Sequence, residues 1–248
     1  NSVADSLIGG AIHADIAAGN SAPADLFEDF LSAYCDVASF TQVGVLPASY
    51  ALNGVITEQQ TALEILAALA FQLRCYFRMV CGTAQLIFRP DTLTSAATIS
   101  ACLVSNGRKA LARRKGASDD IINTINLRYG RDWTSDKADA AYTAIATVSD
   151  ATSIADYGQS ERPELFYCDF ITDATMAASV AAFYLAHYKR RPWLYEFRTF
   201  LDHASRSFAD HVTLGFAGDT VVELQSVGMS PGDNTTIDTI RFIGRRYV

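Results

Sequence analysis

The stretch INTINLRYG, residues 122–130, decides how the second half of the chain is read. Its apolar side chains Ile125, Leu127 and Tyr129 alternate with polar ones, and this period of two predicts a half-buried β-strand. The segment before it is basic and rich in turn residues, so we expect a domain boundary near Gly116. The stretch holds no catalytic motif, which leaves the question of what kind of domain it begins.

Behind this strand the sequence predicts antiparallel β-structure that carries one long helix. The helix is expected over residues 173–189, with Thr172 as its N-cap, because apolar residues recur there at helical spacing. Val180 and Tyr184 lie on its apolar face, which we expect to be buried against the β-domain. A proline, Pro192, follows the helix and favours its end near residue 190.

A short helical turn, DATSIADYG, is predicted between two strands. Asp150 is its expected N-cap, and Gly158 is expected to end it with a positive φ, since glycine accepts that conformation at low cost. The other apolar segments of the second half are read as strands. They are AYTAIATVS (141–149), ELFYCDFI (164–171), WLYEFRTFL (193–201), ADHVTLGF (209–216), TVVELQSV (220–227) and TIDTIRFIGRRYV (236–248).

The first half reads as helices followed by a hairpin. One helix is expected over residues 24–35 and a second over residues 57–73, with Thr57 as N-cap and Gln60 in the capping-box position. The short apolar runs CYFRMV and AQLIFRP come next, and Gly82 between them suits a tight turn. These patterns predict a β-hairpin directly after the second helix.

Together these patterns place the chain in the α+β class. Residues 1–116 are expected to form a helix and hairpin domain, and residues 117–248 a mostly antiparallel β-domain that contains the helix 173–189. The length agrees, because 248 residues, half of them apolar, suffice for two modest domains with buried cores.

Charge and hydropathy exclude two classes of partner. The formal net charge of −7 disfavours a nucleic-acid-binding surface, which needs clustered Lys and Arg. The one basic run, residues 108–115, is interpreted as a solvated loop. No apolar run approaches the roughly 20 residues of a membrane-spanning helix. The sequence opens on Asn-Ser-Val without an initiator Met, so we expect it to be part of a longer protein.

The cysteines indicate buried, reduced thiols rather than a disulfide framework. Their number is odd, and no CxxC pair or histidine partner occurs at metal-ligand spacing. A bridge across the predicted hairpin, between the second and third of them, is an alternative that this pattern does not favour. The five are Cys35, Cys75, Cys81, Cys102 and Cys168.

One short segment carries residues that could hold a metal ion. LDHASRSFADH, residues 201–211, brings carboxylates and imidazoles close in sequence, and such groups can be metal ligands. A strand and a turn separate them, so their directions are not fixed, and we expect no metal site. The candidates are Asp202, His203, Asp210 and His211; the remaining histidines, His13 and His187, have no such neighbours.

Catalytic motifs give no support for an enzyme. The chain contains no G-x-S-x-G, G-x-x-x-x-G-K-[ST] or G-x-G-x-x-G pattern. Two acidic groups could in principle supply the acid and base of a glycosidase: Asp25, Glu28 and Asp29, and Glu161 and Glu164. Three aromatic residues that alternate on one predicted strand are interpreted as core rather than as a sugar platform: Trp193, Tyr195 and Phe197. We therefore expect no catalytic, cofactor-binding or metal-binding residues.

The order of the segments resembles the tail-hub or baseplate proteins of long-tailed bacteriophages and prophages. The resemblance spans residues 24–216 and rests on a helix and hairpin with an Arg-Pro exit, an Asn-rich strand ending in Tyr-Gly, a Ser-Ile-x-x-Tyr-Gly turn and an Ala-rich helix. The matching residues are Asn123, Asn126, Tyr129, Gly130, Ser153, Ile154, Tyr157 and Gly158. One departure occurs at SFADHVTLGF, which has Asp210 where members of this group carry Pro-Gly-Asp.

The resemblance implies a structural role in a virion tail. Such proteins form rings, often trimers, and contact neighbouring tail proteins, so we expect a homo-oligomer that also binds other tail components and that is made and assembled in the bacterial cytoplasm. Two alternatives stay open at this point: a cell-wall glycan hydrolase, and a small-ligand-binding α+β domain.

Overall fold

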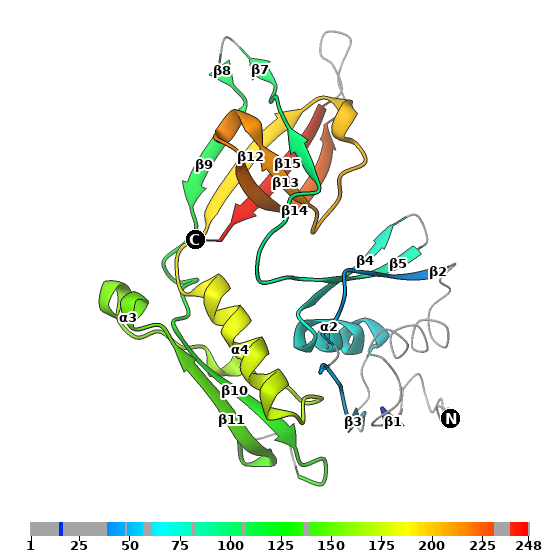
Figure 1. Cartoon of the computed structure of the whole chain (residues 1–248), viewed down its shortest axis with the longest axis vertical. Helices are drawn as coiled ribbons and strands as arrows, with labels where there is room; N and C mark the ends of the chain where they lie inside the picture. Colours follow the sequence, from blue (N-terminus) through cyan, green and yellow to red (C-terminus); the bar gives the residue numbers. More distant parts are fainter. Residues whose placement is uncertain are drawn as a thin grey trace. The chain divides into compact units, whose positions relative to one another are not determined.

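The chain folds into two units, each built from two separate segments (Figure 1). The computed structural model describes residues 15–16, 39–47, 49–56, 61–80, 83–105, 108–135, 139–230 and 239–247. Unit 1 combines residues 1–89 with 123–185, and unit 2 combines residues 90–122 with 186–248. Helices and predominantly β-structure together give the α+β class.

This division differs from the single expected boundary near residue 116. The chain passes from unit 1 to unit 2 after Arg89, returns at Asn123, and leaves unit 1 again within a helix at Leu185. The physical reason is strand pairing, because a strand from before residue 116 pairs with one from after residue 190. A boundary predicted from local composition cannot take account of strand pairing between distant segments.

In unit 1, helix α2 (Ala62–Gln72) begins later than expected. Its N-cap is Thr61, whose backbone N–H donates to Glu64 Oε2 at 2.8 Å, while the Glu64 N–H donates to Thr61 Oγ1 at 3.3 Å. The predicted cap at Thr57 and capping-box residue Gln60 are therefore wrong for this helix. Threonine followed three residues later by a carboxylate forms the reciprocal box, since an ionised acceptor bonds more strongly than an amide.

Two small sheets accompany α2. β4 (Cys75–Val80) pairs antiparallel with β5 (Thr83–Phe88), and β2 (Ser39–Val43) pairs parallel with the other side of β5. β1 (Asp15–Ile16) and β3 (Gly54–Val55) form a separate antiparallel pair. Other expectations lie outside the described residues: the helix 24–35, the turn at Gly82, and the side chains of His13, Asp25, Glu28, Asp29, Cys35 and Cys81.

The INTINLRYG strand is present as β10 (Thr124–Arg131), but it does not begin the large sheet. Among the described strands, β10 pairs with β11 (Tyr142–Ser149) in a two-stranded antiparallel sheet of unit 1. Ile125 and Leu127 are fully buried, as the alternation predicts. The apolar face of β10 is thus buried within unit 1, to which the strand belongs.

Helix α3 (Ala151–Tyr157) follows β11, capped as predicted by Asp150, whose Oδ1 accepts from the Ser153 N–H at 2.8 Å. The segment ELFYCDFI, predicted as a strand, is instead a 3₁₀ turn (Pro163–Leu165) followed by an irregular stretch beside β10. The proline at the first position of the turn supplies the helical φ that starts it.

Helix α4 (Ala174–Tyr188) begins at a different cap and packs on a different partner than expected. Asp173 Oδ1, not Thr172, accepts the Met176 N–H at 2.7 Å. Val180 and Tyr184 are buried. However, Tyr184 stacks on Phe71 of α2 at 4.5 Å and donates its hydroxyl to the Phe71 carbonyl at 2.7 Å, so its partner is an α-helix of unit 1 and not the β-domain.

Unit 2 is built on a six-stranded sheet in the order β6-β13-β14-β15-β12-β9. All neighbours are antiparallel except β6 and β13, which are parallel. The strands are β6 (Ala97–Ile99), β9 (Leu111–Lys115), β12 (Trp193–Thr199), β13 (His211–Leu214), β14 (Thr220–Ser230) and β15 (Thr239–Arg246). A short hairpin, β7 (Val104–Ser105) with β8 (Arg108–Lys109), precedes β9. The basic run 108–115, expected as a loop, is therefore largely β-strand.

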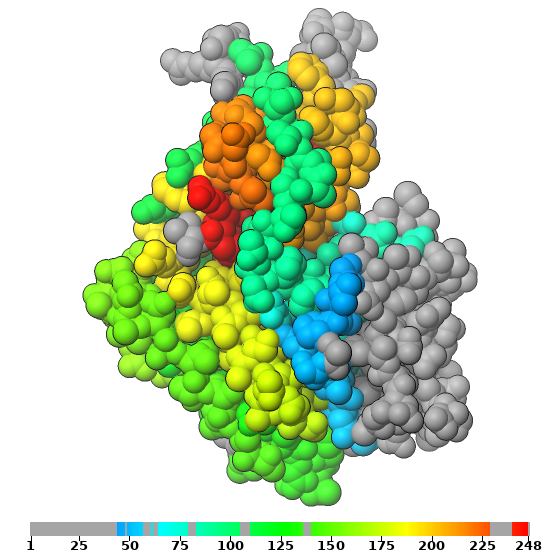
Figure 2. Space-filling view, in the orientation of Figure 1, coloured from blue at the N-terminus to red at the C-terminus, as the bar shows by residue number. Residues whose placement is uncertain are grey.

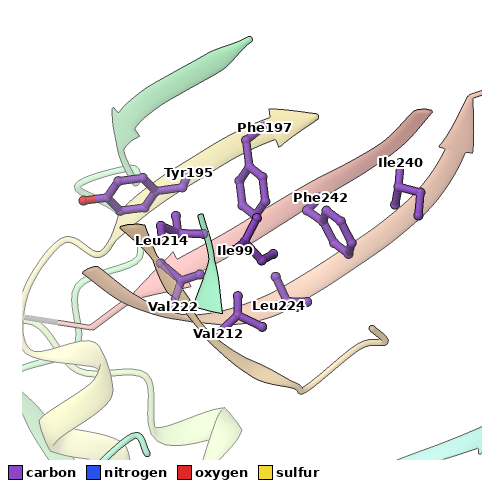
Figure 3. Close-up of a cluster of buried hydrophobic side chains, with 9 residues drawn as sticks. All are labelled: Ile99, Tyr195, Phe197, Val212, Leu214, Val222, Leu224, Ile240 and Phe242. Carbon is purple, nitrogen blue, oxygen red and sulfur yellow. The ribbon is translucent and has the colours of Figure 1, made fainter. Parts of the chain in front are cut away.

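The core of unit 2 is one apolar cluster on this sheet (Figure 3). Phe197 and Phe242 stack at 5.4 Å between ring centroids, and both are fully buried. Tyr195 is buried beside them, whereas Trp193 lies at the margin of the cluster, so the aromatic alternation of β12 does serve packing. Within the described parts of the chain, no helix has the length and apolarity needed to cross a membrane.

Candidate functional site

Two of the residues that carry the family resemblance, Asn123 and Gly158, are joined by a hydrogen bond that fixes a loop of unit 1, an arrangement termed the clamp here. The Asn123 side chain is fully buried; its Nδ2 donates to the Gly158 carbonyl at 2.7 Å, and its Oδ1 accepts from the Ser160 N–H at 2.8 Å. Gly158 has the predicted positive φ of 79°, with an extended ψ of 165° in place of the left-handed helical value. That region of backbone space is essentially open to glycine alone, so the clamp fixes a loop and leaves no group for chemistry.

A second polar cluster in unit 1 is also internally satisfied. Arg131 Nη1 lies 3.1 Å from Asp169 Oδ2, and the Tyr142 hydroxyl donates to Asp169 Oδ1. Burial raises the pKa of the Tyr142 phenol, and the hydrogen bond to Asp169 raises it further, so the hydroxyl stays protonated as a donor. The Trp133 ring lies under the Arg131 guanidinium at 4.4 Å. This arrangement is a structural ion pair covered by aromatic rings.

The candidate metal ligands do not form one group. His203 Nε2 lies 3.4 Å from Asp202 in a 3₁₀ turn, and Asp210 Oδ2 accepts from the Ser207 N–H at 2.9 Å. His211 instead faces Glu223 of β14 at 3.5 Å, a partner that sequence proximity does not reveal. No cluster of three or more potential metal ligands occurs among the residues described.

The acidic pair proposed for a glycosidase is exposed and engaged elsewhere. Glu161 Oε2 accepts from Asn126 Nδ2 at 2.8 Å, and Glu164 lies 4.0 Å from Arg162. Neither glutamate lines the cleft described below. Among the cysteines, Cys75, Cys102 and Cys168 are buried, and burial raises the pKa of the Cys75 thiol to about 12, which makes it a poor nucleophile.

Unit 2 contains an open cleft of about 540 Å³ that sequence reasoning missed. His187, at the end of α4, lies edge-on to the Tyr247 ring at 4.2 Å, and the Tyr247 hydroxyl lies 3.2 Å from Oε1 of the buried Glu223. Charged side chains of both signs line the opening: Asp91, Lys189, Asp219 and Arg246. The cleft could hold a small polar molecule, but its lining comes from segments far apart in the sequence, so no motif announces it.

The two sheets end in edge strands of opposite character. β9 closes one side of the six-stranded sheet with three exposed basic side chains, and Arg113 lies over the Trp193 ring at 3.8 Å. β11 forms the outer strand of the two-stranded sheet in unit 1 and contains no charged residue along its whole length. A strand edge can pair with a strand of another chain, so these two edges are candidate contact sites.

No protein-family model and no curated protein matches the chain. Solved structures do share its fold. A tail protein from Neisseria meningitidis MC58 aligns over 90% of this chain and 66% of its own, with a TM-score of 0.60 and 11% identity. A chain of the virion of a native gene transfer agent particle aligns over 96% of this chain and 48% of its own, with a TM-score of 0.58 and 13% identity.

A 43 kDa tail protein of prophage MuSo2 from Shewanella oneidensis aligns over 90% of this chain and 62% of its own, with a TM-score of 0.51 and 14% identity. The chain thus spans between about half and two thirds of the length of these proteins. At such low identity the likeness establishes that the chain shares the fold of these three proteins.

Proposed function

We propose that this chain is a structural component of a phage or prophage tail, located at the hub of the tail tip or baseplate. The observation that carries the proposal is the shared fold: tail and virion proteins align over 90% to 96% of the chain, across both units. The segment order that resembles tail-hub proteins in the sequence points the same way. The chain acts by assembly and carries no catalytic site of its own.

Exposed apolar side chains support a role in assembly. Val45, Val104, Ile145 and Leu165 each expose more than half of their surface, from 53% to 85%. Where a partner covers one of these side chains, the buried apolar area stabilises the contact. The partners proposed are copies of the same chain, arranged in a ring of three, and neighbouring tail proteins. The mature location is the virion tail, after assembly in the bacterial cytoplasm.

Loss of the protein should stop tail completion. An early stop codon in the gene should yield particles without a tail tip, and supplying the intact gene in trans should restore it. Particles of normal morphology and infectivity would contradict the structural role. The proposed ring of three chains is tested by measuring the molar mass of the purified protein by light scattering. A mass of three chains supports the ring, and a strictly monomeric protein argues against it.

The cleft in unit 2 favours one second function, the binding of a small polar ligand. Its open shape and charged lining fit a molecule that carries both charge signs. Thermal-shift screening against amino acids, nucleotides and amino sugars would reveal such a ligand by a raised melting temperature. The control is Lys189→Ala, which should remove the effect for a ligand held by its anionic group.

A further inference from the structure

Charge is divided unequally between the two units. Unit 1 contains 7 basic and 17 acidic residues, a formal net charge of −10. Unit 2 contains 13 basic and 10 acidic residues, a formal net charge of +3. The value of −7 for the whole chain hides this difference. Since opposite net charges attract, unit 2 of one copy is electrostatically complementary to unit 1 of a second copy.

Positive charge in unit 2 is concentrated at one side of its sheet. The outer strand there is β9, and its last three residues, Arg113, Arg114 and Lys115, are all exposed. We call these three the basic edge. The segment 92–118 around them contains no acidic residue. In the part of the chain that the structure describes, none of the three forms an ion pair with a carboxylate. The basic edge therefore has the charge to receive an acidic partner.

The basic edge is partly held in place before any partner arrives. The guanidinium carbon of Arg113 lies 3.8 Å from the Trp193 ring centroid, and Lys115 Nζ lies 5.3 Å from it. Such contacts favour the cations where they lie over the ring. Cations on an outer strand also oppose pairing with a further strand. We therefore expect a contact made by side chains, without extension of the sheet.

Unit 1 exposes a segment of the opposite charge. Asp156, Glu161 and Glu164 are exposed on and after α3. Asp156 forms no ion pair among the described residues, and the printed partner of Glu161 is a neutral amide, Asn126 Nδ2 at 2.8 Å. Glu164 lies 4.0 Å from the exposed Arg162, a solvated pair of small energy. We call residues 156–165 the acidic segment.

Both surfaces also expose apolar side chains. In the acidic segment, Tyr157 is 48% and Leu165 is 53% exposed, and Figure 2 shows this yellow-green segment at the surface of the molecule. In unit 2, Val104 of β7 is 59% exposed, in the hairpin that directly precedes β9. Protein interfaces combine buried apolar area with complementary charge. The two surfaces thus supply both contributions.

We propose that the basic edge of one copy binds the acidic segment of a second copy. The contact joins two different surfaces, so each copy keeps one surface of each kind for a further copy. Repeated contacts of this kind close into a ring when the rotation between copies allows it. The inference rests on the ring of copies proposed above and names the surfaces that join them. A two-fold pair would set like charges against each other, which is unfavourable.

Two charge-neutralised variants of the full chain test the contact by complementation. Each lacks one surface, so each alone should have its Kd for self-association raised by about a hundredfold. An equimolar mixture should form a 1:1 dimer, because the first variant keeps the acidic segment and the second keeps the basic edge. Sedimentation velocity measures the masses, and circular dichroism checks the folding. The first variant is Arg113→Gln with Arg114→Gln and Lys115→Gln, and the second is Asp156→Asn with Glu161→Gln and Glu164→Gln.

A matched pair of single variants separates the contact from a general effect of charge. Arg114→Gln and Arg241→Gln each remove one exposed arginine from the same sheet, but Arg241 lies on β15 and is paired with Glu196. Arg114→Gln should weaken self-association about tenfold, and Arg241→Gln should leave it unchanged. Raising the salt from about 0.05 M to about 0.5 M should weaken the wild-type association, because salt screens exposed charges.

The outcomes distinguish this contact from the ring itself. Wild-type protein that associates, with a mass that neither triple variant changes, would overturn the contact and leave the ring to other surfaces. Wild-type protein that stays monomeric at low salt and high concentration would overturn both. A mixture of the two triple variants that remains monomeric, while the wild type associates, would show that these two surfaces do not bind each other.

Discussion

The two units of this protein both bury apolar side chains, but unit 1 also buries arginines among aromatic rings. Unit 2 is held by a cluster of hydrophobic side chains contributed by five strands (Figure 3). Unit 1 has fully buried apolar side chains too, Leu69 among them. In addition it buries arginines among aromatic rings: Arg74 lies 4.0 Å from the Phe183 centroid, and Arg89 lies 4.4 Å from that of Tyr76. The stability that apolar packing contributes depends on how well the side chains fill the available volume. The stability of a buried charged group depends on the direction of its hydrogen bonds and ion pairs. The apolar cluster of unit 2 should thus respond to lost side-chain volume, and the buried arginine contacts of unit 1 to lost hydrogen-bond geometry.

The buried arginine after α2 illustrates the second kind. Arg74 adopts a positive φ of 58°, which is uncommon for a residue with a side chain. Its Nη1 donates to the Tyr50 hydroxyl at 3.3 Å, and its Nη2 donates to the Arg89 carbonyl at 3.1 Å. The side chain therefore joins the start of the hairpin to α4, since Phe183 lies on that helix. Arg74 thus contributes both to the turn between α2 and β4 and to the packing against Phe183.

The largest effect is expected from removing volume in unit 2. Phe242→Ala should lower the free energy of unfolding by about 3 to 5 kcal/mol, because the ring is fully buried and stacked on Phe197. Urea denaturation measures the loss. The matched control is Phe200→Ala, whose ring is 44% exposed and whose removal should change stability little. Similar losses for the two variants would refute the proposed core.

The next effect tests the directional interior of unit 1. Asp169→Ala leaves Arg131 buried without its carboxylate and should cost about 3 kcal/mol. The control is Glu196→Ala, which breaks the Arg241–Glu196 pair at a similar distance of 2.8 Å but with both side chains about half exposed. That change should cost less than about 1 kcal/mol. Equal costs for the buried and the exposed pair would remove the distinction between the units.

Backbone geometry gives a smaller difference. Gly158→Ala should destabilise by about 2 kcal/mol, because its φ of 79° with ψ of 165° excludes a Cβ. Gly228→Ala is the control: a Cβ meets no atom within 4 Å at either position, and only Gly158 has a positive φ. The Gly228 variant should match or slightly exceed wild type in melting temperature. A neutral Gly158→Ala would show that the loop relaxes freely.

The smallest effect carries a pH signature. Tyr142→Phe removes the hydrogen bond to Asp169 and should cost about 1 kcal/mol near neutral pH. Since the pKa of Tyr142 is raised in the folded state, its stabilisation is complete below the unfolded value of about 10 and declines as pH rises above it. The difference in unfolding free energy between wild type and variant should therefore shrink above pH 10. A difference that stays constant to pH 11 would argue against the buried phenol.

Local periodicity predicted much of the secondary structure, because strand alternation and helical spacing are patterns of residues that lie close together in the sequence. β10, β12 and α4 follow directly from such patterns, and Asp150 and Gly158 show that cap chemistry is local as well. The fold class follows from these elements. Where two caps compete, as at Thr57 and Thr61, the pattern alone does not choose.

Features set by distant residues were not predictable. β9 pairs with β12, which lies about 80 positions later in the sequence. No short stretch of sequence therefore reveals the boundaries of the units or shows that the basic run 108–115 is β-strand. The packing partner of α4 was predicted wrongly because the many alanines of this helix leave several of its faces able to pack. The stacking of Tyr184 on Phe71 shows which face packs on α2. The cleft and the His211–Glu223 contact were not predictable for the same reason, because each brings together residues from separate segments of the chain.

The most direct test of the tail role is to locate the protein in purified particles. An affinity tag on the chain, detected by gold labelling in electron microscopy, should mark the end of the tail distal to the head and leave the head and tail tube unmarked. Gold on the head, or particles that contain none of the protein, would contradict the assignment of this fold to a tail component.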